Sequence, residues 1–592
     1  MKKVLLPFLV LLLVTVTQVY SQSLMDYVDA VQGETLVIKD YFDMNFEPSS
    51  IINAVELDTE APAGRVYMLK ADGYYPLSRG FNVPAARAVV LEGEDSTPVV
   101  ASTSDAMPPI LCGYTSEGST NTGGINFQNN LTVRNVIALP KVDDGSLGWA
   151  YFGASAVGFT LTLENVLMES TRWVFIQSND YANSSIILRD CYFVNMSGQN
   201  CRRNGGVYDN VGTNTDRMIV ENCTHVMGSG MMYKFRNFAV NEAFFNHNTF
   251  VNCSGQLFPT FGYQSNWVVT NNLFINSNVQ GYYPSLDEGE TDQDHLPMGI
   301  INVNVLPEGF EGAVPAAERK ILVDRNGIYW DSRLDQIVPA LNAAAVNGRT
   351  DWVTQMLTMN SRTQTMFNDN ATYPKFTEGE WIMGGDPNFV NPLDLMTDQV
   401  DVFIEWSIAC MDDETTAIMP DWRTEGNPAE ENYIFPDWPV PVDLSYTNDA
   451  YVTAAYAGLP LGDLNWFPAL KAQWEAQKDA EHAEIQAALN EGRVLTSVEG
   501  EFELPVEYQL HQNYPNPFNP TTVISFSLPQ ASNVTLKVYN ALGQEVATLV
   551  NEFKAAQTHT VEFNASNLAS GVYIYKLEAG NFSVSKKMIL MK

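Results

Sequence analysis

Basic and acidic side chains balance one another over one part of an otherwise acidic chain. Between Leu167 and Phe250 seven basic residues match seven acidic ones, whereas the whole chain has 33 Lys and Arg against 69 Asp and Glu. The basic residues here that could bind an anion are Arg202, Arg203, Lys234 and Arg236. Guanidinium forks bind planar anions in bidentate fashion, so uronate or sulfate groups of a polysaccharide would suit them. The alternative, which we favour, is pairing with neighbouring carboxylates.

Aromatic residues follow this segment at short intervals. Phe258, Phe261, Tyr263 and Trp267 lie in a stretch that also contains Gly and Pro. Exposed rings could stack on sugar faces, although loops folded onto a core need apolar anchors too, and packing is the simpler reading. Together with Asp216, these considerations give seven candidate glycan-binding residues: Arg202, Arg203, Asp216, Lys234, Arg236, Tyr263 and Trp267.

Carboxylates that could act as acid and base are present but do not form a complete set. Asn214-Thr215-Asp216 resembles the Asn-Thr-Asp of polygalacturonases, which hydrolyse uronans with carboxylates. The family's Asp-Asp, Gly-His-Gly and Arg-x-Lys elements are missing, so no catalytic residue is assigned. A calcium-assisted lyase could use Asp209, Asp216 and Arg236, but only if they converge in one cleft.

No metal or other cofactor is expected. The acidic stretch at residues 287–295 lacks the ligand spacing of an EF-hand, and the six cysteines show no Cys-x-x-Cys pair. Calcium is chemically possible and has no specific support. We therefore expect a solvated acidic loop at 287–295.

The elements that must position these residues are short repeated strands. Each ends near an Asn or Asp, and these anchors stand at 135, 165, 190, 222, 248, 272 and 326, spaced by 30, 25, 32, 26, 24 and 54 residues. The segments are rich in β-branched and aromatic residues and lack a helical period. Periodicity of this length indicates a solenoid, so we predict an all-β, right-handed parallel β-helix.

Successive coils of such a solenoid stack about 4.8 Å apart, so equivalent residues should form columns. The anchors would make an Asn ladder, and Asn195, Asn252 and Asn276 a second one. Arg134, Glu164, Arg189, Glu221 and His247, each just before an anchor, would pair along the sheet. Cys191 and Cys223 could bridge between coils, although buried free thiols are at least as compatible with the sequence.

The start of the chain strengthens this prediction through a family resemblance. Ile51 to Val55, Arg65 to Leu69, Ala71 to Tyr75 and Val89 to Gly93 resemble the opening coils of pectate-lyase-like β-helices. The resemblance covers residues 33–335 and implies architecture alone, because this fold hosts lyases, hydrolases, adhesins and scaffolds.

Later segments are expected to decorate and close the solenoid, which would occupy residues 22–469. Insertions fall at about 277–320 and 334–385, with a short helix at 334–348, and residues 385–392 and 458–467 are similar to terminal coils. A helix at 470–492, stopped by Gly492, would cover the open last coil. A linker at 493–507 leads to residues 508–592.

Both ends of the chain predict export. Lys2-Lys3 and the apolar run from Val4 to Val16 indicate a signal peptide over residues 1–21. Residues 508–592, with Asn513-Tyr514-Pro515-Asn516-Pro517-Phe518-Asn519-Pro520 near their start, closely resemble the type A sorting domain of the type IX secretion system. A small antiparallel β-sandwich is expected there. The resemblance implies delivery to the outside or the cell surface, with the secretion machinery as a partner and frequent removal of the domain.

Function is therefore constrained more by location than by chemistry. We expect a secreted or surface protein that binds glycan or serves as a structural or adhesive element, the alternative being a polysaccharide lyase or glycoside hydrolase. The net charge of −36 argues against nucleic acid as a partner. After the signal peptide, no segment is apolar for long enough to span a bilayer.

Overall fold

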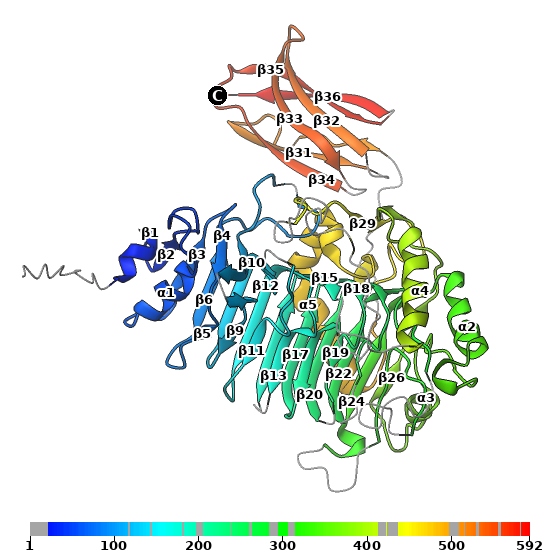
Figure 1. The fold of residues 1–592 in the computed structure, drawn as a ribbon. Coiled ribbons are helices and arrows are strands. Elements are labelled where there is room, and N and C mark those ends of the chain that lie inside the picture. Colours follow the sequence, from blue (N-terminus) through cyan, green and yellow to red (C-terminus); the bar gives the residue numbers. More distant parts are fainter. Residues whose placement is uncertain are drawn as a thin grey trace, which may run out of the picture.

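The computed structural model describes residues 22–592 apart from 103, 117–118, 143–144, 180–182, 197–204, 237, 260–262, 283–293, 306–313, 413–421, 423–435, 497–507, 514, 529–531, 555–557, 581 and 592. The expected signal peptide, Arg202, Arg203, Phe261 and most of the acidic stretch at 287–295 lie outside the described residues. Figure 1 shows a mostly β main body whose strands run side by side, and a smaller β unit at the C-terminus.

The main body is built from three ladders of parallel strands, to which the chain returns in turn. The first ladder consists of β2 (Thr35–Ile38), β3 (Val66–Leu69), β6 (Val89–Gly93), β10 (Leu131–Leu139), β12 (Thr160–Glu169), β14 (Ser184–Arg189), β17 (Thr215–Glu221), β20 (Ala239–Asn246), β22 (Tyr263–Thr270), β24 (Lys320–Asp324) and β26 (Phe376–Glu378).

The second ladder consists of β4 (Tyr74–Leu77), β7 (Ile110–Ser116), the later parts of β10 and β12, β15 (Tyr192–Met196), β18 (Thr224–Gly228), β21 (Thr249–Cys253), β23 (Leu273–Ile275), β25 (Asn326–Tyr329) and β27 (Trp381–Ile382). These two ladders belong to one 21-stranded sheet. Its two remaining strands form hairpins, with β1 (Val28–Gln32) antiparallel to β2 and β8 (Ser119–Asn121) antiparallel to β7.

The third ladder is a separate six-stranded sheet. It consists of β5 (Phe81–Val83), β9 (Ile125–Phe127), β11 (Phe152–Ala154), β13 (Val174–Asn179), β16 (Gly206–Val211) and β19 (Tyr233–Lys234). Inward-facing residues of all three ladders, such as Phe127, Leu163 and Phe250, share one buried apolar core. The hydrophobic effect thus holds the ladders around a common interior.

The anchor column forms as predicted over its first half and then shifts by one residue. Residues 135, 165, 190 and 222 lie in register between the first and second ladders, but the next member is His247 and not Asn248. Every residue of this column has a positive φ, between 51° and 58°, as far as Arg325. Left-handed backbone is what turns the chain from one ladder to the next, and Asn and Asp adopt it most readily among non-glycine residues.

A buried Asn ladder occupies the adjacent column. The side-chain Oδ1 of Asn272 accepts from both the backbone N and the Nδ2 of Asn248, at 2.9 Å each, and Asn326 does the same for Asn272. The second predicted ladder is also present, since Asn276 donates to Asn252 at 3.1 Å, although Met227 stands between Asn252 and Asn195.

The expected pairing of charges along the first ladder is present. Arg189 lies 3.8 Å from Glu164 and 3.6 Å from Glu221, and Arg134 lies 3.2 Å from Glu92. Asn246, and not His247, continues this column. Cys191 and Cys223 stack in neighbouring coils but are free, buried thiols, so the disulfide considered between them is wrong.

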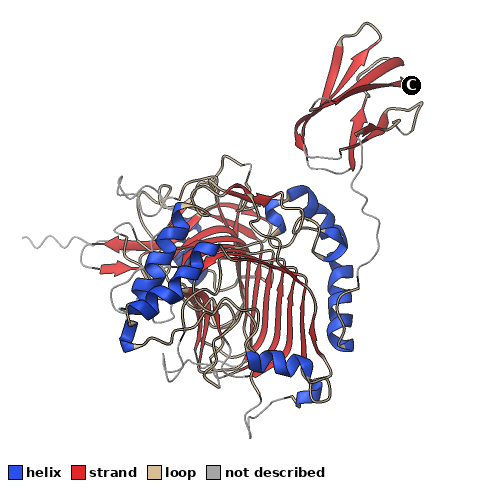
Figure 2. Cartoon of the chain, turned by 90° about the vertical axis from the view of Figure 1, so that its right-hand side faces the viewer, coloured by secondary structure: helices blue, strands red, loops and turns tan. Residues whose placement is uncertain are grey.

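Five α-helices lie among the described residues: α1 (Ser50–Leu57), α2 (Ile337–Ala343), α3 (Ser361–Asn368), α4 (Asp398–Asp412) and α5 (Pro468–Glu491). Figure 2 shows that helices lie outside the strands of the main body. Residues 51–55, expected as part of a coil, instead lie in α1, where Ile51, Ile52 and Val55 are buried. The second expected insertion contains α2 and α3. Short 3-10 turns lie nearby at Ser332–Gln336 and Val346–Gly348.

The segment before α5 and α5 itself were expected to end the stack, but they cover its flanks. Residues 458–467 run along the turn between the first and second ladders. There the backbone N of Gly462 donates to the carbonyl of Asn271, the hydroxyl of Thr224 donates to the Asp463 carboxylate, and the backbone N of Asp463 donates to the hydroxyl of Thr249. Helix α5 runs beside the first ladder, packing Ile485 and Leu489 on Val268 and Leu322 (Figure 1). It ends at Gly492, which has a φ of 69°.

The C-terminal unit contains two antiparallel sheets around their own core. One holds β30 (Gln509–Leu510), β31 (Thr521–Ser527) and β34 (Thr558–Asn564), and the other holds β32 (Ser532–Asn540), β33 (Glu545–Lys554), β35 (Gly571–Ala579) and β36 (Phe582–Leu590). Among the described residues, no helix has the length and apolar character needed to cross a membrane.

Candidate functional site

The outer faces of the three ladders differ in what covers them. The second ladder's outer face, including Ile137, Val194 and Val251, packs under residues 389–474 in a second apolar core. Part of the first ladder's outer face is covered by α5. The third ladder presents instead a polar column that consists of Asn82, Asn126, Gly153, Gln177, Asp209 and Lys234. A functional site on this body is therefore best sought on the third ladder.

Asp209 is the centre of the polar contacts on this ladder. Its side chain is fully buried, and both carboxylate oxygens accept from Arg236, with the Nε to Oδ1 distance 2.8 Å and the Nη2 to Oδ2 distance 2.9 Å. The indole Nε1 of Trp173 donates to the same Oδ2 at 3.0 Å. Three donors on one carboxylate fix the orientation of the Asp209 side chain, as charge-assisted bidentate pairs do.

Two tryptophans and an arginine extend this cluster to the surface. Trp149 and Trp173 occupy equivalent positions of neighbouring coils, because the backbone N of Val174 donates to the carbonyl of Trp149. Their rings are 6.5 Å apart in an edge-to-face arrangement, and the Arg172 guanidinium carbon lies 4.6 Å from the Trp149 ring centroid. Trp149 is 50% exposed, which is a large apolar area for a tryptophan on the surface.

The seven candidate residues from the sequence separate in the structure. Arg236, with 30% of its side chain exposed, and Lys234, which is buried and in register with Asp209, belong to this cluster. Asp216 is exposed on β17 of the first ladder and accepts from Asn241 at 3.1 Å. Asp209 and Asp216 thus belong to different sheets, and Arg202 and Arg203 are not described.

The two aromatic candidates are structural anchors. Trp267 is 3% exposed and packs against Phe235 in the main core. Tyr263 is buried, donates its hydroxyl to the carbonyl of Val314, and lies with its ring 4.5 Å from the guanidinium of Arg319. Both side chains are buried in this structure, so neither ring is exposed for stacking on a sugar.

The tryptophans were missed because exposure cannot be judged from residue type. A signal for them exists in the sequence, since Gly148-Trp149 and Arg172-Trp173 are 24 residues apart, one coil of the repeat. The cluster of Trp149, Arg172, Trp173, Asp209, Lys234 and Arg236 is called the Trp149 site below. It offers an exposed ring, a cation above that ring and a fixed ion pair.

Metal chemistry finds no support in the described part of the chain. No three His, Cys, Asp or Glu side chains there lie close enough together to hold a metal ion. The described carboxylate of the Trp149 site is already bound by Arg236 and Trp173.

Comparison with known proteins identifies the C-terminal unit. Residues 512–591 match the model of the secretion system C-terminal sorting domain, which confirms the expectation for this part and indicates export by the type IX secretion system. The protein is therefore secreted or located at the cell surface. A search of curated proteins found no match for the chain.

One solved structure with local similarity is that of PorZ, an essential bacterial surface component of the type IX secretion system of Porphyromonas gingivalis. The two chains are 18% identical over 16% of this chain and 13% of PorZ, with a TM-score of 0.11. The matched region thus spans about an eighth of the length of PorZ.

Proposed function

We propose that this protein is an exported, right-handed parallel β-helix that binds an acidic glycan at the Trp149 site. The observation that carries the proposal is the exposed Trp149 ring beside the cation Arg172. Aromatic rings stack on the apolar faces of sugars, and guanidinium groups bind carboxylate or sulfate substituents. A repeated wall of equivalent positions suits a polymer whose units also repeat.

Binding is favoured over catalysis by the state of Asp209. Glycoside hydrolysis needs two carboxyl groups on either side of the scissile bond, one of which delivers a proton. Asp209 is buried, and both of its carboxylate oxygens already accept from Arg236 or Trp173, so they are occupied by contacts within the protein. Asp216, the other candidate, lies on a different sheet.

The test is a binding measurement with the exported chain on three immobilised polysaccharides: a uronate polymer, a sulfated polymer and a neutral glucan. We expect retention by at least one acidic polymer and not by the neutral glucan, with binding weakened by salt. Trp149→Ala and Arg172→Ala should each weaken binding at least about tenfold, the loss of one stacking or charged contact.

Arg217→Ala is the matched control, because Arg217 is also exposed but pairs with Glu242 on the first ladder. Equal loss in this control, or equal retention by all three polymers, would refute the Trp149 site. Release of unsaturated uronides or new reducing ends by the unmodified protein would instead establish the enzyme alternative.

A further inference from the structure

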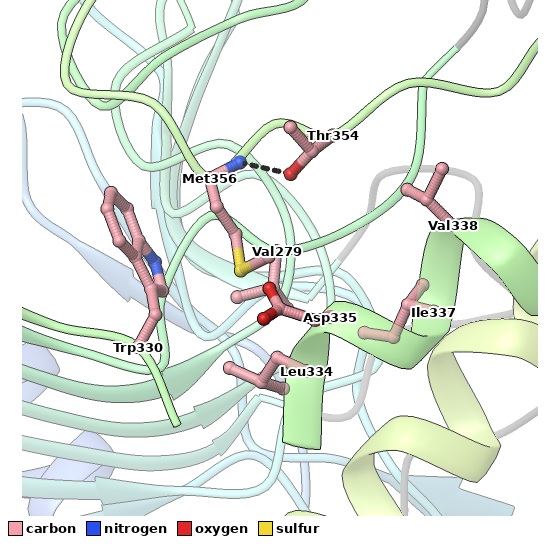
Figure 3. A pocket seen from close by; sticks show the side chains of 8 residues that line it. All are labelled: Val279, Trp330, Leu334, Asp335, Ile337, Val338, Thr354 and Met356. Carbon is pink, nitrogen blue, oxygen red and sulfur yellow. Dashed lines mark hydrogen bonds between the residues drawn. The ribbon is translucent and has the colours of Figure 1, made fainter. Parts of the chain in front are cut away.

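A cavity lies beside the helical insertion that follows β25. Figure 3 shows the cavity, about 290 Å³ in volume, between the 3-10 turn at Ser332–Gln336, the start of α2 and the segment around Met356. Its walls are mainly apolar and consist of Val279, Trp330, Leu334, Ile337, Val338 and Met356. Thr354 and Asp335 are the polar residues that complete the lining.

Asp335 is exposed to solvent, and its carboxylate lies at the edge of this apolar cavity. In Figure 3 it lies beside the side chains of Met356 and Val279, above Leu334, with Trp330 on the other side of the cavity. Leu334, Ile337 and Val279 are each 1% exposed, so the floor of the cavity is rigid core. Asp335 makes no hydrogen bond or ion pair within the described part of the chain, so its carboxylate oxygens remain available as acceptors.

The neighbouring arginine cannot neutralise Asp335, because its donors are committed elsewhere. Arg333 donates through Nε and Nη2 to the two oxygens of Asp331, and through Nη1 to Asp401. The carbonyls of Met396 and Thr397 accept from its remaining N–H groups. A guanidinium has five N–H donors, and all five are used by these partners.

The hydroxyl of Thr354 makes one hydrogen bond within the protein. Its Oγ1 accepts from the backbone N of Met356 at 3.0 Å, the dashed line in Figure 3, which leaves its O–H as a donor at the cavity wall. The indole Nε1 of Trp330 donates to the carbonyl of Ser277 at 2.8 Å, which fixes the ring at the cavity wall. The cavity therefore offers a ligand one carboxylate acceptor, one hydroxyl, an indole ring and aliphatic walls.

We propose that this cavity binds a primary alkylammonium group. The alkyl stem would be removed from water by Leu334, Val338 and Met356, and the ammonium would donate to Asp335 beside the Trp330 ring, which also attracts cations. The size of the cavity, at the lower end of ligand sites, limits the ligand to a single chain such as a lysine side chain. The net charge of −36 would draw such cations toward the protein.

The test compares three probes of equal length by calorimetry on the full exported chain: n-pentylammonium, 1-pentanol and pentanoate. Pentylammonium should bind at least about tenfold more tightly than pentanol, because only the cation gains the charge-assisted bond to Asp335, and pentanoate should not bind. The peptides acetyl-Gly-Lys-Gly-amide and acetyl-Gly-norleucine-Gly-amide show whether the alkylammonium group comes from a free amine or from a lysine side chain of a protein. Preference for the lysine peptide over the free amine assigns the site to lysine side chains of proteins.

Two variants identify the site. Asp335→Asn keeps the shape and removes the charge, so pentylammonium affinity should fall about tenfold while the affinity for pentanol stays unchanged. Asp449→Asn, at an exposed aspartate away from the cavity, is the matched control and should change neither. The proposal is overturned if pentanol binds as tightly as pentylammonium, if Asp335→Asn has no effect in a chain of unchanged melting temperature, or if none of the amines binds.

Discussion

Single buried polar residues in the main body are held by partners from distant parts of the chain. Asp463 is fully buried, and its Oδ2 accepts from the hydroxyl of Thr224 at 2.7 Å. Its Oδ1 accepts from the backbone and the side chain of Asn465, each at 2.8 Å. Burial nevertheless raises the pKa of Asp463 to about 7, although the charge of Lys471 and these hydrogen bonds act in the opposite direction. Folding thus favours the protonated form of this carboxyl group.

The first prediction concerns the pH dependence caused by Asp463. The folded pKa of Asp463 lies above the ordinary value of 3.8, so the contribution of this carboxyl group to the free energy of unfolding is most favourable below about pH 4. That contribution is lost as the pH rises to about 7. One such group changes the free energy of unfolding by about 1.4 kcal/mol per pH unit in that window. Asp463→Asn should therefore flatten the fall in urea midpoint between pH 4.5 and 7.5. Equal slopes in the two proteins would show that Asp463 is ionised throughout.

The candidate site illustrates which residue-level inferences the sequence permits. Side-chain alternation predicted Lys234 and Arg236 on one face of a strand, but β19 ends at Lys234 and Arg236 has a positive φ of 49°. The pairing alternative anticipated the contact between Arg236 and Asp209. The exposure of Trp149 could not be foreseen, because it follows from which ladder face remains uncovered. Which face remains uncovered depends on where the described residues between 389 and 491 pack against the ladders, and no local sequence pattern encodes this position.

At the scale of elements, columns of equivalent residues determine how successive strands align. The repeat was predictable because each coil needs a left-handed residue at its first corner, and Asn or Asp occupies that position at 135, 165, 190 and 222. The one-residue shift of the turn column from the predicted Asn248 to His247 was not predictable. Asn also fills the adjacent column, and residue type alone does not distinguish the two columns. Only φ separates the turn column, where His247 has 55°, from the ladder of Asn248, Asn272 and Asn326.

The second prediction tests this ladder at Asn272. Besides bonding Asn248 and Asn326, its Nδ2 donates to the carbonyl of Phe245 at 3.0 Å. Asn272→Ala leaves several buried donors and acceptors unpaired, each costing about 1–3 kcal/mol, so we expect a loss of at least about 3 kcal/mol in unfolding free energy. Asn241→Ala, which removes a solvated bond to Asp216, is the control and should change stability by less than about 0.5 kcal/mol. Urea denaturation decides, and a similar small loss in both variants would contradict a structural ladder.

Helix α5 shows that a helix is easier to predict than the surface it covers. Its Ala-rich and Glu-rich composition and the stop at Gly492 are local features, and both were predicted. Its position is set by residues more than 200 positions earlier: His482 lies 2.6 Å from Glu221, and Glu481 lies 3.1 Å from His247. Such contacts bind the helix to the flank instead of the last coil.

The third prediction is that α5 docks less firmly as the pH rises. Burial alone would lower the pKa of His482, but its hydrogen bond and the charges of Glu221 and Glu481 outweigh burial and raise the pKa above 6.5, while Glu221 has a lowered pKa. The stabilisation is therefore complete below pH 6.5 and is lost as the pH rises through the raised value. Amide protection factors of α5 should decrease between pH 6 and 8.5, and His482→Gln should remove that decrease. Unchanged protection in the unmodified protein would mean that the ion pair does not hold the helix.

The whole molecule consists of a body with several connected cores and a sorting domain with a core of its own. The core of the sorting domain includes Ile524, Leu536 and Tyr575, and its apolar members come from residues 508–590 alone. The body, in contrast, extends past α5, because Leu495 is 4% exposed among Val268, Leu322 and Leu489. The backbone N of Leu495 also donates to Asp324 at 2.9 Å.

The fourth prediction follows from where the body ends. A chain that stops after residue 496 should unfold at the same temperature as the body of the full chain, because its apolar contacts and the Arg493 pair with Glu484 are intact. A chain that stops after residue 491 loses the burial of Leu495 and should melt at least about 2 °C lower, as expected for a deleted core leucine in a large domain. In calorimetry, the full chain should show one additional transition, which belongs to the unfolding of the sorting domain. If the chain ending at 496 also melts lower, the sorting domain stabilises the body through contacts; if the chain ending at 491 is unaffected, Leu495 does not close the flank.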